Sequence, residues 1–418
     1  MNITLTLAWR NLWRHRRRTW LTVSAMVFCN VLLIFSIALQ FGTYGLMIEN
    51  SLKLFTGHLQ IQHPKYLDSP KLHYSIDDAA KLQTQLQQEL GENWALASRG
   101  MGFALVSSEE RSFGIQVVGV EPGREPMVSS LPGLVKSGKY LPSAPTETIE
   151  IVIGRKIADN LKVELGDELT LLGSGRDGSF AAGIAIVTGI FDSGVSDIDR
   201  AMAQIPLDDF QTLFTMEQQV HSIVIQGSSA ANADALQERL RQWRASHVKQ
   251  SFAPVWQPRH WDELLPGVRQ AIQSDIASSL FLYSILTLLV AFSVLNTQLM
   301  SVLERTREFG ILSALGISPG QLGRLVMLET LLMASLGFAL GVLLGAIIVY
   351  AISQVGISFP GMEEMHSRFN MPARIYPELS MLPLTLGPAV ILVGSLLASL
   401  YPALRLQRLE PVAAMRAA

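Results

Sequence analysis

The sequence predicts an α-helical membrane protein with four transmembrane helices and a large α+β extracytoplasmic domain between the first and second spans. Three observations support this prediction. The 418 residues are 49% hydrophobic and only 16% charged, whereas soluble proteins carry roughly 25% charged residues. The apolar excess is gathered in four blocks, each long enough for the roughly 20 residues that a span needs. Between the first two blocks, the chain has the alternating texture of a soluble domain.

An amphipathic cytoplasmic helix is predicted at residues 1–19, ahead of a first span at residues 20–46. The apolar positions of this helix recur at helical spacing, at Leu5, Ala8, Trp9, Leu12 and Trp13. A basic helix with tryptophans suits a membrane interface, and the alternative is a merely solvated basic face. The apolar run that follows exceeds the roughly 7–15 residues of a secretory signal, so we expect an uncleaved span. The arginines before it place the N-terminus in the cytoplasm.

Residues 47–278 are predicted to form a periplasmic α+β domain with stalk helices. Alternating segments bounded by turn residues predict strands at 58–62, 112–120, 184–190 and 222–225. Apolar positions three and four apart predict helices at 76–89 and 230–243. The glycine-rich stretch 173–178 lacks the terminal lysine of a P-loop, so a hairpin loop is expected there. The region is long enough for one or two compact domains.

The remaining spans are predicted at 279–302, 322–352 and 381–404, with a periplasmic loop at 353–380 and a cytoplasmic tail at 405–418. Three glycines of the third span are spaced by four and let another helix approach closely, either in the same subunit or in a dimer partner. These helix-packing or dimer candidates are Gly337, Gly341 and Gly345. Glu329 is an ionisable residue in the same span. We expect water or Arg324 to serve it and assign it no transport role.

Few residues suggest a catalytic, disulfide-forming or metal-binding role. Cys29 is the single cysteine, so an intrachain disulfide is excluded, and its apolar surroundings favour a packing role. No nucleophile motif is present, and the scattered histidines lack metal-ligand spacing. These histidines are His58, His63, His73, His221 and His260. We therefore expect neither a membrane enzyme nor a metal site, and no basic–aromatic pattern suggests nucleic acid.

Residues 303–321 interrupt the apolar blocks and predict a short amphipathic helix at the cytoplasmic surface. Glu304 and Glu308 share one face, and Arg305 is three residues from Glu308 and can pair with it. An apolar edge is expected at Phe309, Leu312 and Leu315. Gly316 marks the end of the helix. Because two spans flank this helix, a protein that pushes on it would move both spans; the alternative is a passive surface helix.

Residues 302–316, VLERTREFGILSALG, resemble the signature of the FtsX/MacB/LolCE superfamily of ABC-transporter permeases. Residues 7–12 resemble the start of such permeases, and residues 401–403, 405 and 409–416 resemble their C-terminus. Ile153-Gly154, together with Leu165-Gly166-Asp167, is similar to the MacB-like periplasmic core domain. The likeness thus extends over nearly the whole chain.

This resemblance implies a permease that pairs with a second permease, the same or a related chain, and binds a dimer of ABC ATPase subunits. The helix at 303–321 would be the coupling helix that contacts the ATPase. Its implied coupling residues are Glu304, Arg305, Arg307, Glu308, Phe309, Gly310, Leu312, Leu315 and Gly316. The chain has no Walker A motif, so we expect it to bind no cofactor and the partner to use the ATP. The expected location is the bacterial inner membrane, with both termini cytoplasmic.

Residues 189–199 and 205–210 are similar to a segment of the lipoprotein-releasing permeases. The resemblance therefore implies extraction or release of lipoproteins from the inner membrane, with a lipoprotein and a periplasmic carrier as partners. Two alternatives remain open. One is MacB-like efflux of a peptide or small amphiphile, and the other is FtsX-like regulation of a periplasmic enzyme.

Overall fold

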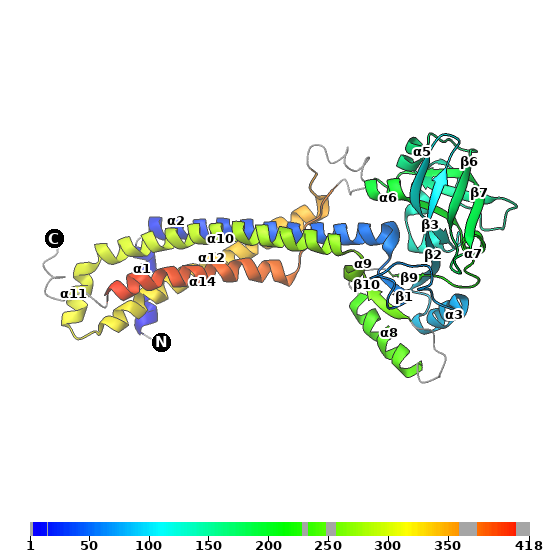
Figure 1. Cartoon of the computed structure of the whole chain (residues 1–418). Coiled ribbons are helices and arrows are strands. Elements are labelled where there is room, and N and C mark those ends of the chain that lie inside the picture. Colours follow the sequence, from blue (N-terminus) through cyan, green and yellow to red (C-terminus); the bar gives the residue numbers. More distant parts are fainter. Residues whose placement is uncertain (1–2, 15, 228–232, 248–255, 359–373, 407–418) are drawn as a thin grey trace. The chain divides into compact units, whose positions relative to one another are not determined.

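The computed structural model describes residues 3–14, 16–227, 233–247, 256–358 and 374–406. These residues form two compact units, a helical bundle and an α+β unit that spans Leu46–Gln270 (Figure 1). The predicted fold class is confirmed, because the α+β unit lies between the first and second long helices. Most of the predicted loop at 353–380 and nearly all of the predicted tail fall outside the described residues.

The bundle contains four described helices that are long and apolar enough to cross a membrane. They are α2 (Arg16–Ser51), α10 (Pro266–Glu304), α12 (Pro319–Val355) and α14 (Met381–Leu406). Two shorter helices accompany them, α1 (Ile3–Arg14) and α11 (Thr306–Ala314). α10 begins at Pro266, well before its apolar block, and α12 begins at Pro319. Proline suits the first helical turn because its missing N–H is not needed there.

The glycine stripe of α12 packs against α2 of the same chain. A Cβ added to Gly341 would lie only 2.5 Å from the Cβ of Asn30, and Gly337 and Gly345 approach α2 almost as closely. Asn30 Nδ2 also donates a hydrogen bond to the carbonyl of Gly337 at 3.2 Å. The structure therefore shows the intrachain alternative. Gly337, Gly341 and Gly345 lie against Met26, Asn30 and Ile34 of α2, respectively.

α2 and α10 lie side by side and are joined by polar contacts at two levels (Figure 1). At one level, the Oγ1 atoms of Thr22 and Thr297 are 3.0 Å apart. At the other, Gln40 and Tyr44 donate hydrogen bonds to Asp275 at 2.8 and 2.7 Å. The two helices are thus fixed to each other along most of their shared length.

The α+β unit contains ten described strands and several short helices. The strands are β1 (Leu59–Gln62), β2 (Ala95–Ser107), β3 (Ser112–Val120), β4 (Val135–Gly138), β5 (Ile149–Gly154), β6 (Glu168–Ser174), β7 (Phe180–Phe191), β8 (Met202–Pro206), β9 (Ser222–Gln226) and β10 (Gln257–His260). The helices are η1 (Leu52–Thr56), α3 (Ala79–Leu90), α4 (Glu125–Val128), η2 (Leu131–Leu134), α5 (Arg155–Leu161), α6 (Ser196–Ala201), α7 (Leu207–Leu213), α8 (Ala233–His247) and α9 (Trp261–Leu264).

Six of these strands pair in a closed ring, in the order β2, β3, β8, β5, β7, β6 and back to β2. Closing a sheet removes its exposed edges. The interior is filled by a continuous apolar cluster. The side chain of Phe210, on α7, lies directly on Gly100 and Gly119, where an added Cβ would be 2.3 and 2.4 Å from it. These glycines are needed because any side chain would displace the phenylalanine.

Of the four remaining strands, β4 pairs with β7. The other three extend the sheet from the first half of β2, in the order β9, β1 and β10. Their apolar face forms a second core with α3 and α8. The predicted strands and helices are confirmed, with shifted ends. The stretch predicted as a hairpin loop does join β6 to β7, and Gly178 adopts φ +85° there.

Candidate functional site

α11 is anchored to the bundle by a small apolar core. Phe309 is buried and belongs to one cluster with Ala8 of α1 and residues of α12. The guanidinium of Arg305 stacks over the Phe309 ring, 4.9 Å from its centroid. The helix ends at Ala314, and Gly316 follows with φ +93°, a conformation that favours glycine. The helix end predicted at Gly316 is confirmed.

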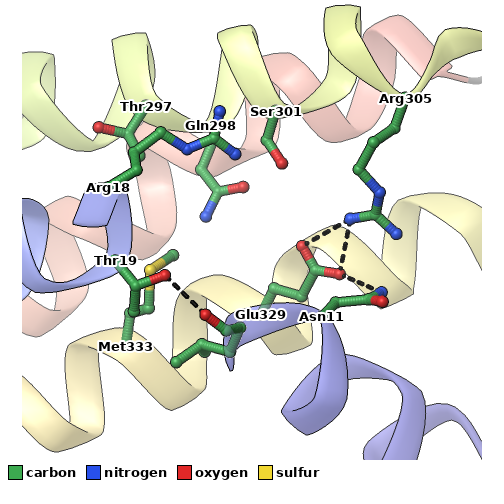
Figure 2. A pocket seen from close by; sticks show the side chains of 10 residues that line it. Asn11, Arg18, Thr19, Thr297, Gln298, Ser301, Arg305, Glu329 and Met333 are labelled. Atoms are coloured by element: carbon green, nitrogen blue, oxygen red, sulfur yellow. Dashed lines mark hydrogen bonds and ion pairs between the residues drawn. The ribbon is translucent and has the colours of Figure 1, made fainter. Parts of the chain in front are cut away.

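A buried ion pair joins the start of α11 to α12. Nη1 of Arg305 lies 3.0 and 3.3 Å from the two carboxylate oxygens of Glu329, and the two side chains are only 10% and 7% exposed. Asn11 of α1 donates to the same carboxylate at 2.8 Å (Figure 2). Glu329 is therefore held by Arg305 and Asn11, and the expectation that Arg324 serves Glu329 is wrong. A buried charge needs partners, so this contact fixes α1 and α12 to the start of α11.

Two outer pairs extend this network. Arg14 donates to Glu308 at 2.8 Å, and Arg18 donates to Glu304 at 2.9 Å. Arg305 also lies 3.3 Å from Glu308, which confirms their predicted pairing. Burial alone raises the pKa of Glu308, but hydrogen bonds from Arg305 and Arg14 outweigh burial and hold that pKa below its ordinary value. Exposed pairs of this kind contribute about 0–1 kcal/mol each. The Arg14–Glu308 pair therefore mainly orients α1 against α11, and the Arg18–Glu304 pair orients the start of α2 against the end of α10.

The implied coupling residues divide into an inward and an outward set. Arg305, Phe309 and Gly310 are buried within the chain and position α11. Glu304 and Glu308 are engaged by arginines, and Leu312 is partly buried against the apolar core. An outward face remains open to another protein. Its exposed residues are Arg307, Ile311, Leu315 and Gly316.

A small polar cavity of about 30 Å³ lies beside the buried ion pair. Thr297, Gln298 and Ser301 line it from α10, and Figure 2 shows Gln298 pointing towards Glu329. Gln298 is buried, and its Oε1 has no hydrogen-bond partner within the described part of the chain. A polar space of this size suits about one or two water molecules. Thr297 and Gln298 therefore border a polar space.

Sequence reasoning missed the contribution of α1. Asn11 lies 318 residues from Glu329, and Arg14 lies 294 residues from Glu308. Periodicity within one helix cannot reveal such a contact. The available signal was charge, because an arginine-rich N-terminus and three glutamates occur in segments that the topology brings to one end of the bundle.

The α+β unit carries a second surface of interest, which we call the outer apolar wall. It is the outward side of β2, β6 and β7 in the strand ring, where Leu105 pairs with Leu172 and Leu172 with Ala182. Residues opposite one another on neighbouring strands share a face. Four large residues are exposed on this face, at 64%, 44%, 77% and 58%: Phe103, Leu105, Phe180 and Ile184. Exposed apolar surface is a feature of interaction sites, so this wall is a candidate site.

No metal centre is found among the described residues, because no three His, Cys, Asp or Glu side chains are grouped closely enough to hold an ion.

Two family models match the chain. Residues 19–243, more than half of the chain, match the MacB-like periplasmic core domain. The chain belongs to this family of permeases. Residues 280–411 match the FtsX-like permease C-terminal model, which includes α11 and the helices around it. The superfamily suggested by residues 302–316 is thereby confirmed, and the four long helices make this permease a multi-pass membrane protein.

Several curated proteins are similar to this permease. The lipoprotein-releasing system transmembrane protein LolC of Neisseria meningitidis is 22% identical over 322 residues, 75% of each chain. The corresponding protein LolE of Haemophilus influenzae is 25% identical over 324 residues, 74% of each chain. The macrolide export ATP-binding/permease protein MacB of Hyphomonas neptunium is 31% identical over 172 residues, 41% of this chain and 23% of that protein.

Proposed function

We propose that this permease is the membrane subunit of an ABC transporter that releases lipoproteins from the inner membrane. In this proposal a separate ABC ATPase dimer binds and hydrolyses the ATP, and the permease binds no nucleotide. α1 and α11 face the cytoplasm together with both termini. The likeness to LolC and LolE over three quarters of the chain supports the lipoprotein substrate.

The observation that carries the mechanical part of the proposal is the division of α11 into two faces. Its inner face is bound to α1 and α12 through the Arg305–Glu329 pair and the Phe309 core. Its outer face exposes Ile311 and Leu315. A push by the ATPase on the outer face would therefore move α1, α12 and the end of α10 together. α2 would follow because it is bound to α10 by side-chain contacts.

We further propose that the released lipoprotein passes to a periplasmic carrier at the outer apolar wall. A carrier that shields acyl chains needs an apolar partner surface during the transfer, and Phe103 and Phe180 supply one. A second permease, the same or a related chain, would complete the transporter.

The docking of the ATPase is tested by changing the outer face of α11. Ile311→Glu with Leu315→Glu places two charges on this face and should reduce co-purification of the ATPase at least tenfold, while membrane insertion is retained. Leu165→Glu is the matched control, because Leu165 is also exposed but lies in the α+β unit. Undiminished co-purification of a correctly inserted Ile311→Glu/Leu315→Glu variant would refute the docking role.

Glu308→Lys tests the position of α11 separately. Lysine would repel both Arg14 and Arg305, which now hold Glu308. We expect this variant to insert normally but to lose recruitment or stimulation of the ATPase. Normal ATPase coupling in this variant would contradict the proposed role of the network.

MacB-like efflux is a second candidate, favoured by the 31% identity to MacB over 172 residues. A photo-crosslinking amino acid at Phe180 distinguishes the candidates, and the same group at Leu165 serves as the control. Lipoprotein release predicts crosslinks to a lipidated protein and its carrier. Efflux predicts crosslinks to an exported peptide or adaptor, and FtsX-like regulation predicts crosslinks to a cell-wall hydrolase.

A further inference from the structure

The corner between α1 and α2 presents opposite faces to different surroundings. Asn11 and Arg14 reach inward to Glu329 and Glu308. On the outward side, Trp9, Trp13 and Trp20 form a ladder of edge-to-face contacts, with ring centroids 5.9 and 6.2 Å apart. Trp9 and Trp20 are about half exposed, and Leu21 beyond them is 70% exposed. The aromatic ladder therefore continues directly into the outer surface of a membrane-spanning helix.

Three arginines lie beside this ladder: Arg10, Arg16 and Arg17. All three are exposed and make no ion pair within the described part of the chain, whereas Arg14 and Arg18 are paired with glutamates. The corner thus combines exposed indole rings with a cluster of uncompensated positive charge.

We propose that this outward face of α1 and the start of α2 binds anionic phospholipid, and that the bound lipid holds α1 against α11 and α12. Tryptophan prefers the level of the lipid headgroups, and arginine forms bidentate hydrogen bonds with phosphate. Attraction to an anionic leaflet increases with each basic residue near the surface. The continuity of the ladder with α2 identifies the bilayer, rather than a soluble acidic protein, as the occupant.

Lipid bound to the outward face of α1 also affects the contacts that its inner face makes. α1 is short, and its inner contacts include Ala8 in the apolar core, Leu12 and the hydrogen bonds of Asn11 and Arg14. Isolated helices of this length are marginally stable. Lipid bound to the outward face therefore stabilises the contacts that position Glu329 and Glu308. This effect of lipid on α1 does not depend on which substrate the transporter moves.

Lipid selectivity is measured on the full-length protein in nanodiscs by quenching of tryptophan fluorescence. Brominated phosphatidylglycerol and brominated phosphatidylcholine are compared at equal mole fraction in a phosphatidylcholine bilayer. Three of the seven tryptophans belong to the ladder, and the variant with Trp9, Trp13 and Trp20 changed to Phe measures the background from the others. We expect at least threefold stronger quenching of the ladder by the anionic lipid, with a preference that declines as salt screens the charges.

The arginine cluster is tested by Arg10→Gln, Arg16→Gln and Arg17→Gln together, which should abolish the preference. Arg241→Gln, an exposed arginine of α8, should leave it unchanged. Equal quenching of the wild-type ladder by both lipids overturns the proposal without reference to any variant.

Hydrogen exchange of α1 in the same nanodiscs tests the second half of the inference. Amides of α1 should exchange several-fold more slowly when phosphatidylglycerol is present. Equal exchange in both lipids overturns the claim that lipid holds α1 in place. Neither measurement uses the ATPase, so either can fail while the proposed function stands.

Discussion

At the scale of single residues, the Arg305–Glu329 pair creates the strongest constraint, because both charges are almost fully withdrawn from water. Taking a charge out of water is costly unless a partner replaces the lost hydration. Arg305 has two such partners, Glu329 and Glu308, whereas Glu329 has Arg305 and the neutral Asn11. Glu329 therefore depends on Arg305 more than Arg305 depends on Glu329.

Arg305→Met should consequently destabilise the bundle by about 3–5 kcal/mol, because it leaves the Glu329 carboxylate buried with only an amide partner. The measurement is the thermal unfolding of the purified full-length protein in detergent. Arg307→Met is the matched control, since Arg307 is exposed on the same helix and should change stability by no more than about 0.5 kcal/mol. Equal loss of stability in both variants would show that the pair has no special role.

His221 gives a second residue-scale prediction, in the α+β unit. Its Nδ1 accepts a hydrogen bond from the amide of Met101 at 2.9 Å, and burial lowers its pKa to about 4. An unfolded histidine titrates near pH 6.5, so the unfolded chain binds more protons between these values. The neutral, buried His221 therefore contributes to the free energy of unfolding. This contribution is complete above about pH 6.5 and is lost as pH falls towards 4, by up to roughly 3 kcal/mol.

Unfolding of the full-length protein should therefore become markedly easier between pH 6.5 and pH 4, and His221→Gln should flatten this dependence. The exposed His73→Gln variant is the control and should keep the wild-type slope. Burial also lowers the pKa of His58, but His58 is present in all three proteins. An unchanged slope in the His221 variant would contradict the assignment.

Local residue pairs were predictable from sequence, and distant ones were not. The spacing of Arg305 and Glu308 predicts their contact, because three residues make one helical turn. The sequence predicts water or nearby Arg324 as the partner of Glu329, yet Arg305 reaches it because the intervening chain turns back between α11 and α12. Such a choice depends on tertiary geometry that a linear pattern does not contain.

At the scale of elements, small residues decide how closely α2 and α12 approach. The spacing of the three glycines predicts a close helix contact, but the identity of the second helix follows only from the structure. In the strand ring, too, the strands are predictable from the sequence but their pairing partners are not. β2 pairs with β9 through its first half and with β6 through its second half. Alternation in the sequence predicts a strand but not a change of partner along it.

Gly341→Ala tests the close approach of α12 to α2. The new methyl group would meet Asn30 at 2.5 Å and force the helices apart, which should cost about 1–3 kcal/mol. Gly320→Ala, in the first turn of the same helix, has open space around its Cβ and should be neutral or slightly stabilising because alanine favours helix. Thermal unfolding in detergent compares the two variants, and a neutral Gly341→Ala would contradict the packing.

At the scale of the whole molecule, the placement of apolar blocks along the sequence predicts four spans and one inserted α+β domain, because the bilayer imposes length and hydropathy on every span. The route of a mechanical signal through those spans requires side-chain contacts. α10 is nearly continuous with α11, and its hydrogen bonds to α2 lie near both ends of their shared length. Motion of α11 should therefore move α2 and α10 together, without sliding between them.

A disulfide between these helices tests that conclusion. In a Cys29→Ser background, Thr22→Cys with Thr297→Cys should crosslink readily, because the two hydroxyl oxygens are only 3.0 Å apart. Thr22→Cys with Thr287→Cys is the matched control and should not crosslink, since Thr287 contacts Gly394 of α14. If α2 and α10 move as one rigid unit, the crosslink blocks no motion between them. The crosslinked permease should then retain ATPase stimulation by its substrate within about twofold of the reduced form. A crosslink that forms efficiently and abolishes stimulation would mean that the helices slide past each other, and the signal would then have to travel through α12.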